Sequence, residues 1–175
     1  TVKLFLVDLK AAIRVSFEEE WACPDQTFQL ASVLVDGLPP YRYTWNTGDT
    51  TSFIETSITR PTTYGLTVTD ACGGIGADSV EVAIQPPPVA YLSGTTDWCE
   101  GGANSTLPVS MEGNPPWSLT YRDGQDSLQG FSNIDQNPFL LPVSAPGSYT
   151  LVEFEDKNCR GTGFGQGQVN TRAFS

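Results

Sequence analysis

The sequence predicts an all-β protein made of two tandem modules, and three observations support this prediction. First, residues 23–48 return without a gap as residues 99–124, at an offset of 76, with seven of 26 positions identical. About one or two matches would arise by chance. Second, apolar and polar residues alternate in short runs between Gly, Pro, Asn and Asp, which is typical of strands. Third, 175 residues suffice for two small cores.

The first element comes from the N-terminal residues, which the direct repeat does not cover. Carrying the same offset backwards places residues 1–8 on the final strand of a module and residues 13–17 on the first strand of module 1. A strand as apolar as residues 2–7 invites edge pairing when it is exposed. We therefore expect residues 1–10 to complete a preceding module, or to be donated to a neighbouring copy by strand addition.

The next strands form the repeated part of each module. Residues 31, 33 and 35 fall on one face of a strand, and their counterparts are residues 107–111. After a turn with two prolines, residues 41–45 and 117–121 carry large apolar side chains at every second position, the spacing of one sheet face. We interpret these side chains as core. Each run ends in a polar turn whose glycine supplies the positive φ of a hairpin.

Two further strands close each module. Residues 64–70 and 149–154 give the next strand, and residues 79–84 give the last strand of module 1. A weaker final strand covers about residues 164–171 of module 2. The extra length of module 2 lies between residues 128 and 146 and is too apolar for a solvated loop. We expect most of it to cover a sheet edge or an interdomain seam.

The boundary between the modules is a proline run. Residues 85–89, Gln-Pro-Pro-Pro-Val, lack backbone donors at three positions and prefer the polyproline II conformation. Three prolines span about 9 Å, so we expect a stiff linker between modules lying end to end. The predicted modules are residues 11–85 and 86–175.

Composition narrows the compartment and the partners. Nine basic and twenty acidic residues give a net charge of -11, which repels phosphate backbones and anionic lipid surfaces. We therefore expect no nucleic-acid binding. No run of 18 or more apolar residues is present, so we also expect no membrane insertion. Four cysteines, two in each module, favour disulfides and an oxidising, extracellular location.

The residue content also argues against catalysis. The chain has no histidine, which excludes Ser-His-Asp and Cys-His catalysis and imidazole metal ligands. The alternating glycines at residues 161–167 lack the spacing of a phosphate-binding loop. We predict no enzyme activity, no cofactor and no metal. As an alternative, aspartates near turns could hold calcium between the modules, although aspartate is also a common turn residue. These aspartates are Asp70, Asp78, Asp123, Asp126, Asp135 and Asp156.

Two segments of module 1 carry a family resemblance. Residues 37–51, GLPPYRYTWNTGDTT, followed by residues 63–73, TYGLTVTDACG, resemble the PKD-type and gliding-adhesin-type immunoglobulin-like repeats of Bacteroidota cell-surface proteins. Module 2 is similar but departs from the pattern, with Tyr121 in place of Trp and FEDKNC at residues 154–159. The resemblance implies two tandem immunoglobulin-like (PKD-like) β-sandwich domains, secretion through the type IX route and exposure on the cell surface.

The cysteines are expected to form one bridge in each module, Cys23 with Cys72 and Cys99 with Cys159, because each repeat carries its own pair. Closing such loops would contribute about 4 kcal/mol each. However, Cys23 precedes one strand and Cys72 follows another, so the two can fall at opposite poles of a sandwich. A bridge from Cys23 to Cys159 across the module junction therefore remains the alternative.

The resemblance also implies sugars on the protein. Bacteroidota surface proteins carry O-glycans at Asp-Ser/Thr followed by an apolar residue or Thr, and the pattern occurs at Thr50, Ser79 and Ser127. The same dipeptide is ordinary turn chemistry. Asn104 begins an N-glycan sequon that a bacterium would leave unused.

The function expected from these features is a non-catalytic structural or adhesive segment of a secreted, multi-module surface fibre or adhesin. Its partners would be other modules or copies of the fibre through strand pairing, and surface polysaccharide. One alternative is a carbohydrate-binding accessory region of a secreted polysaccharide-degrading enzyme, in which exposed Trp21, Trp98 or Tyr91 would stack on sugar rings. Another is a subunit of a polymeric surface filament.

Overall fold

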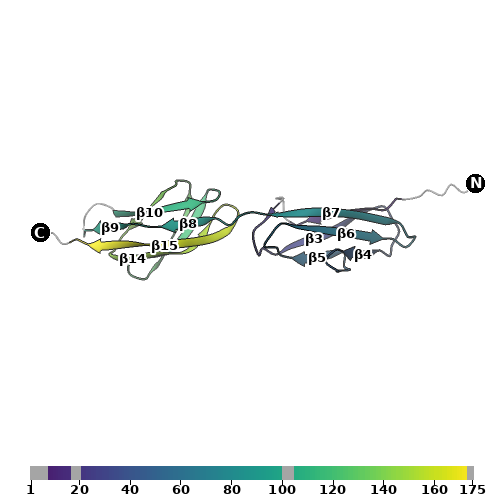
Figure 1. The fold of residues 1–175 in the computed structure, drawn as a ribbon, viewed down its shortest axis with the longest axis horizontal. Coiled ribbons are helices and arrows are strands. Elements are labelled where there is room, and N and C mark those ends of the chain that lie inside the picture. Colours follow the sequence, from purple (N-terminus) through teal and green to yellow (C-terminus); the bar gives the residue numbers. More distant parts are fainter. Residues whose placement is uncertain (1–7, 17–20, 100–104, 173–175) are drawn as a thin grey trace, which may run out of the picture. The chain divides into compact units, whose positions relative to one another are not determined.

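The computed structural model describes residues 8–16, 21–99 and 105–172, and all regular structure in these ranges is β (Figure 1). The predicted all-β fold is confirmed. The chain divides into two compact units, Thr1–Gln85 and Pro86–Ser175, so the boundary lies at the start of the proline run. In the described ranges, no helix is long and apolar enough to cross a membrane.

Module 1 is a sandwich of two sheets. One sheet has the strand order β1-β3-β5 and the other β2-β7-β6-β4. All paired strands are antiparallel except β2, which runs parallel to β7. The strands are β1 (Lys10–Val15), β2 (Trp21–Ala22), β3 (Phe28–Val35), β4 (Arg42–Trp45), β5 (Phe53–Thr56), β6 (Thr62–Thr69) and β7 (Ile75–Ile84).

The first strand of module 1 was expected at residues 13–17, and β1 begins earlier, at Lys10. Residues 1–7 and 17–20 lie outside the described part of the chain. The expected strand donation by residues 1–10 therefore stays a prediction.

Module 2 repeats this plan with one additional strand. Its strand order is β12-β11-β14-β15-β8-β10-β13, and β9 pairs with β15. Two strands come from the extra segment between residues 128 and 146, and they cover the edges of β11 and β10. The strands are β8 (Val89–Leu92), β9 (Thr95–Trp98), β10 (Ser105–Glu112), β11 (Trp117–Arg122), β12 (Leu128–Ile134), β13 (Phe139–Val143), β14 (Gly147–Glu155) and β15 (Arg160–Thr171).

Each module has its own apolar core, enclosed by its strands. The predicted aromatic core is confirmed at Trp45, Trp117 and Tyr121, which are all at most 6 % exposed. Tyr41 and Tyr43 are half-buried and pack against the core of module 1. Burial of these large side chains stabilises each module by about 1.5–3 kcal/mol per side chain.

One strand of the repeat faces opposite ways in the two modules. Val109 of β10 is fully buried, whereas its counterpart Val33 in β3 is 41 % exposed. A shift of one residue turns every side chain of a strand to the other face. Asp36 and Gly37 both have positive φ after β3, whereas among the residues after β10 only a glycine does.

Candidate functional site

A buried aspartate holds the turn between β6 and β7 of module 1. The carboxylate of Asp70 accepts hydrogen bonds from the backbone N–H groups of Leu38 at 3.1 Å, Cys72 at 2.9 Å and Gly74 at 2.7 Å. These bonds lower the pKa of Asp70 below its ordinary value of 3.8, the Gly74 amide contributing most. The carboxylate thus ties this turn to the turn that precedes β4.

Module 2 contains the same arrangement at Asp156. Its carboxylate accepts hydrogen bonds from the backbone N–H groups of Asn114 at 2.8 Å, Asn158 at 2.8 Å and Cys159 at 2.7 Å. Asp70 and Asp156 therefore occupy equivalent positions, and the FEDKNC segment of module 2 keeps the aspartate while losing the rest of the motif. The constant offset of 76 does not align these two aspartates, because the extra strand of module 2 lies before Asp156 in the chain.

Most aspartates considered for calcium are held by other groups. Asp123 accepts hydrogen bonds from the backbone N–H groups of Gln125 and Ser127, both at 2.9 Å, and Asp78 accepts one from Ile13 at 2.7 Å. Asp126 pairs with a neighbouring arginine. An oxygen that accepts an N–H bond is not free to ligate a cation in the same direction. The described ranges contain no cluster of three residues able to hold a metal.

The predicted bridges within each module are wrong. Cys72 and Cys99 are free thiols, whereas Cys23 and Cys159 are disulfide-bonded. In module 1 the reason is distance: Cys72 precedes the ten-residue strand β7 and Cys23 lies beside its other end, about 33 Å away at about 3.3 Å per residue. A disulfide requires Cα atoms within about 7 Å. The alternative bridge from Cys23 to Cys159 uses both bonded cysteines and stays a prediction.

The aromatic residues considered for sugar stacking differ in exposure. Trp21 is half-buried, and Trp98 packs against the core of module 2. Tyr91 is 47 % exposed and stacks on Phe164, with ring centroids 5.7 Å apart and planes at 24°. Phe164 carries no sequence signal for this contact, because the parallel pairing of β15 with β8 that brings the two rings together joins distant segments. Part of each ring therefore contacts the other ring.

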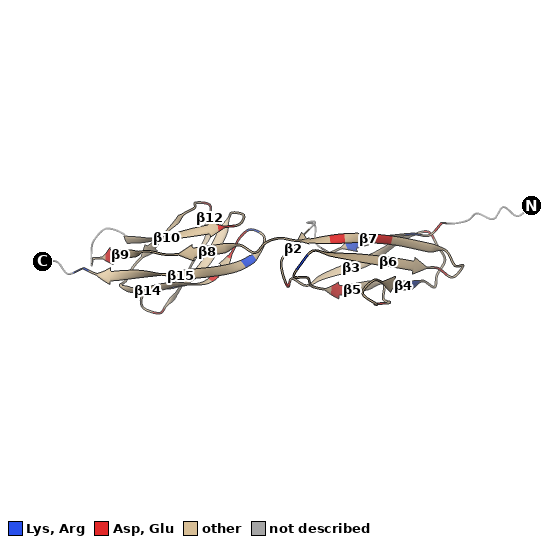
Figure 2. Ribbon diagram, viewed as in Figure 1, with Lys and Arg blue, Asp and Glu red and all other residues tan. Residues whose placement is uncertain are grey.

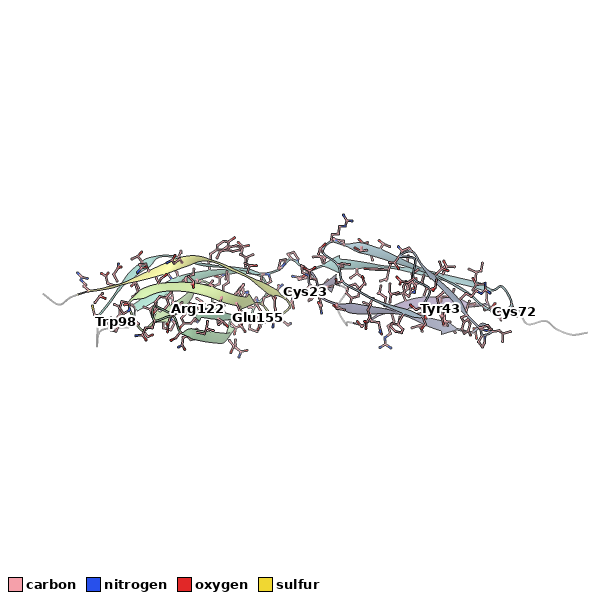
Figure 3. All side chains as sticks on the ribbon, turned by 90° about the horizontal axis from the view of Figure 1, so that it is seen from below. Cys23, Tyr43, Cys72, Trp98, Arg122 and Glu155 are labelled. Carbon is pink, nitrogen blue, oxygen red and sulfur yellow. The ribbon has the colours of Figure 1, made fainter. Side chains whose placement is uncertain are left out.

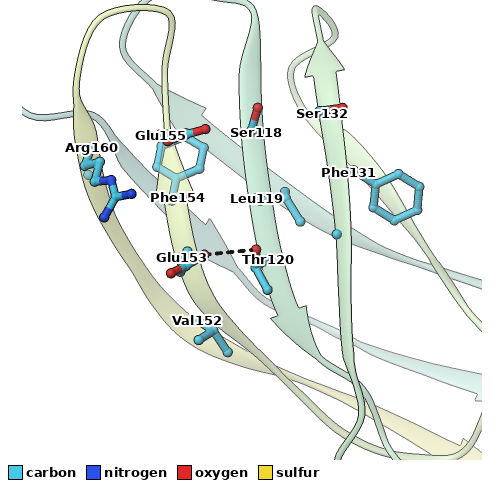
Figure 4. A pocket seen from close by; sticks show the side chains of 12 residues that line it. Ser118, Leu119, Thr120, Phe131, Ser132, Val152, Glu153, Phe154, Glu155 and Arg160 are labelled. Atoms are coloured by element: carbon cyan, nitrogen blue, oxygen red, sulfur yellow. Dashed lines mark hydrogen bonds between the residues drawn. The ribbon is translucent and has the colours of Figure 1, made fainter.

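A polar depression of module 2 lies on the outer face of β11, β12 and β14, beside the start of β15 (Figure 4). It is an open groove of about 560 Å³. Thr120 lies within hydrogen-bond reach of Glu153, with Oγ1 and Oε2 3.3 Å apart. The polar side chains around the groove are Ser118, Thr120, Ser132, Glu153, Glu155 and Arg160.

Two irregular pairings shape this groove. The register between β11 and β14 shifts after Thr120, which leaves Val152 as an additional residue and exposes both Val152 and Glu153. The register between β11 and β12 shifts near Ser132, where Asn133 has a φ of 56°. A β-bulge bends its strand and re-aims side chains, and bulges are common beside binding sites. The groove can therefore present hydroxyls, carboxylates and a guanidinium to a hydroxyl-rich ligand.

Module 1 has a plainer groove at the corresponding place. It is about 600 Å³ and is lined by β4, β6 and β7. Thr44, the counterpart of Thr120 in the repeat, lies in it together with Thr67 and Ser79. The pairings of β4 with β6 and of β6 with β7 have no register shift. Ser79 is thus on an exposed strand face.

The other residues of the O-glycan pattern are also exposed. Thr50 lies between β4 and β5, and Ser127 lies in the turn between β11 and β12. Exposed hydroxyls are a requirement for modification, and glycosylation itself stays a prediction. Asn104 lies outside the described residues.

Comparison with known proteins supports the fold. Residues 94–163 match the family described as the Ig-like domain of nucleoporin POM152. No curated protein matches the chain in sequence.

Several solved structures are similar in fold. The three N-terminal domains of the Hoc protein of bacteriophage RB49 are 12 % identical, with a TM-score of 0.49 over 94 % of this chain and 71 % of that one. The structure of a 1.5-MDa bacterial ice-binding adhesin is 15 % identical, with a TM-score of 0.49, and the match covers 95 % of this chain and 66 % of that one. The N-terminal eight Ig domains of DSCAM are 13 % identical, with a TM-score of 0.43, and the match covers 95 % of this chain and 25 % of that one. The strand orders, the internal repeat and the family match together identify an all-β protein of two tandem immunoglobulin-like β-sandwich domains.

Proposed function

We propose that this chain is a non-catalytic structural segment of a secreted, multi-module cell-surface fibre or adhesin. One observation supports this most strongly: two complete immunoglobulin-like sandwiches follow each other, each with its own core and its own buried aspartate at the same turn. Polar groups that satisfy turn amides stabilise the fold and are not available for chemistry. The acidic surface, with Asp and Glu spread along both modules (Figure 2), favours a soluble extracellular segment.

The redox state of the chain supports the extracellular part of the proposal. Cys23 and Cys159 are disulfide-bonded, and disulfides persist in oxidising compartments. The resemblance of module 1 to Bacteroidota surface repeats supports export by the type IX route.

Labelling intact cells tests this location. Lys10 and Lys157 are exposed, so a membrane-impermeant amine reagent should modify both on intact source cells. Labelling only after the cells are lysed would contradict the proposal. A cytoplasmic protein from the same cells serves as the control for membrane integrity.

A second candidate function is carbohydrate binding by module 2. The two register shifts around the polar groove favour it: the β4–β6 pairing of module 1, which is equivalent to β11–β14, is regular, and β12 has no counterpart in module 1. The occupant would be a neutral glycan, whose hydroxyls suit the carboxylates and hydroxyls of the groove.

Affinity electrophoresis in gels with soluble polysaccharides tests this candidate. Retardation of the native chain by a polysaccharide would support it if two conditions hold. The double variant Thr120→Ala/Glu153→Gln must abolish the retardation, and Thr44→Ala in module 1 must leave it intact. Equal mobility of all variants with every polysaccharide would contradict it.

A further inference from the structure

Each module holds one bonded and one free cysteine, and the two kinds occupy equivalent positions in the modules. Cys23 and Cys99 correspond through the sequence repeat. Cys72 and Cys159 lie in the same turn, two and three residues after the equivalent buried aspartates Asp70 and Asp156, and each donates its backbone N–H to that carboxylate. In both pairs of equivalents one cysteine is disulfide-bonded and the other is a free thiol.

In module 1 the two cysteines lie at opposite ends of the last strand (Figure 3). Cys72 lies just before β7, and the carbonyl of Leu9, where the chain enters the sandwich, lies beside Gly76 near the start of that strand. Cys23 follows β2, whose Ala22 accepts a hydrogen bond at 2.9 Å from the N–H of Gln85, just after β7 ends. Cys72 therefore marks the entry pole of the module and Cys23 its exit pole.

Module 2 has the same polarity. Cys159 lies directly before β15, where Thr162 pairs with Val89 at the start of the module. Cys99 follows β9, which runs parallel to β15 and pairs Trp98 with Thr171 at its far end. The entry-pole cysteine is thus Cys159 and the exit-pole cysteine is Cys99.

The free thiols of the chain are therefore an entry-pole cysteine, Cys72, and an exit-pole cysteine, Cys99. We propose that they are junction thiols, each forming a disulfide with the complementary cysteine of another module of this kind. Cys72 bonds an exit-pole cysteine, and Cys99 bonds an entry-pole cysteine. The partner is a second copy of this chain.

Two observations support this proposal. The equivalents Cys159 and Cys23 are already disulfide-bonded, so both positions accept such a bond. Cys72 is exposed and Cys99 half-exposed, so both sulfurs are within reach of a partner. The bond forms as two thiols lose two protons and two electrons to an oxidised dithiol or glutathione disulfide, which is reduced to two thiols.

The inference rests on the proposed role as a segment of a multi-module fibre, and its test is independent of cell-surface labelling. The purified chain, with its disulfide intact, is incubated in a glutathione redox buffer. Covalent oligomers should appear on non-reducing gels, and peptide mapping should find Cys72–Cys99 links roughly tenfold above either homodisulfide, a preference of about 1.4 kcal/mol. Random collision would give only the statistical mixture of the three links, and that mixture would overturn the proposal.

Two single variants complete the test. Cys72→Ser and Cys99→Ser each retain one free thiol, so each alone should form no ladder, whereas a mixture of the two should form one heterodimer. Circular dichroism confirms that both variants fold. A mixture that crosslinks no faster than either variant alone would contradict pole-to-pole docking.

Discussion

The hydroxyl of Tyr149 ties the corner between β13 and β14 together, and its removal gives a sharp test of the fold. The side chain is fully buried. Its hydroxyl donates to the carbonyl of Ala145 at 2.9 Å and accepts from the N–H groups of Ala145 at 3.2 Å and Ser144 at 3.3 Å. A tyrosine at this corner is a recurring feature of immunoglobulin-like sandwiches.

Tyr149→Phe keeps the ring and removes these bonds. Ser144 is exposed, so its N–H can turn to water, whereas Ala145 is 5 % exposed and both of its backbone groups lose their partner. Each buried unpaired group costs about 1–3 kcal/mol, so we expect a loss of about 2–6 kcal/mol for the two groups. At about 4–8 °C per kcal/mol, the midpoint of module 2 should fall by at least about 8 °C.

Tyr64→Phe in module 1 is the matched control. The Tyr64 hydroxyl lies 3.1 Å from Thr56 Oγ1 in a part-buried site, so the expected loss is about 0.5–1.5 kcal/mol. Hydrogen exchange followed by mass spectrometry reports each module separately. Equal losses in the two variants, or unchanged protection of module 2 in Tyr149→Phe, would refute this account of the corner.

Three further predictions concern charge, sulfur and sugars. The folded pKa of Asp70 lies below its ordinary value of 3.8, so the ionised carboxylate stabilises module 1 above about pH 4, and this stabilisation is lost as the pH falls through the folded pKa. Urea unfolding should show this loss of stability in the native chain and not in Asp70→Asn. Non-reducing peptide mapping should recover Cys23 linked to Cys159, and a link of either to Cys72 within one chain would contradict the assignment of free thiols. The chain purified from its source should exceed the polypeptide mass by whole hexose-based units that Thr50→Ala or Ser127→Ala reduces, whereas an unmodified mass would rule out the glycan pattern.

Local pattern was sufficient to predict the longer strands of each module and the aromatic part of the core, but not the short strands β2, β5 and β9. Aromatic side chains at every second position between glycine turns predicted the buried Trp45, Trp117 and Tyr121. The exposure of Val33 has a local cause: β3 is apolar on both faces, so alternation alone cannot decide which face is buried.

The candidate sites depend on long-range pairing, which the sequence does not display. Val152 and Glu153 share one face because of a bulge between β11 and β14. Phe164 reaches Tyr91 because β15 runs parallel to β8. The repeat shows only that each module has two cysteines. It does not show that these lie at opposite ends of the last strand of the module, which prevents a disulfide between them.

Single-molecule pulling of the reduced chain tests the central claim, that this is a segment of two independently folded modules suited to bear tension. The units Thr1–Gln85 and Pro86–Ser175 should unfold in two separate steps, each releasing at most about 300 Å of chain at about 3.5 Å per residue. Tyr149→Phe should lower the force of one step and leave the other unchanged. A single step that releases the whole chain at once would contradict the claim.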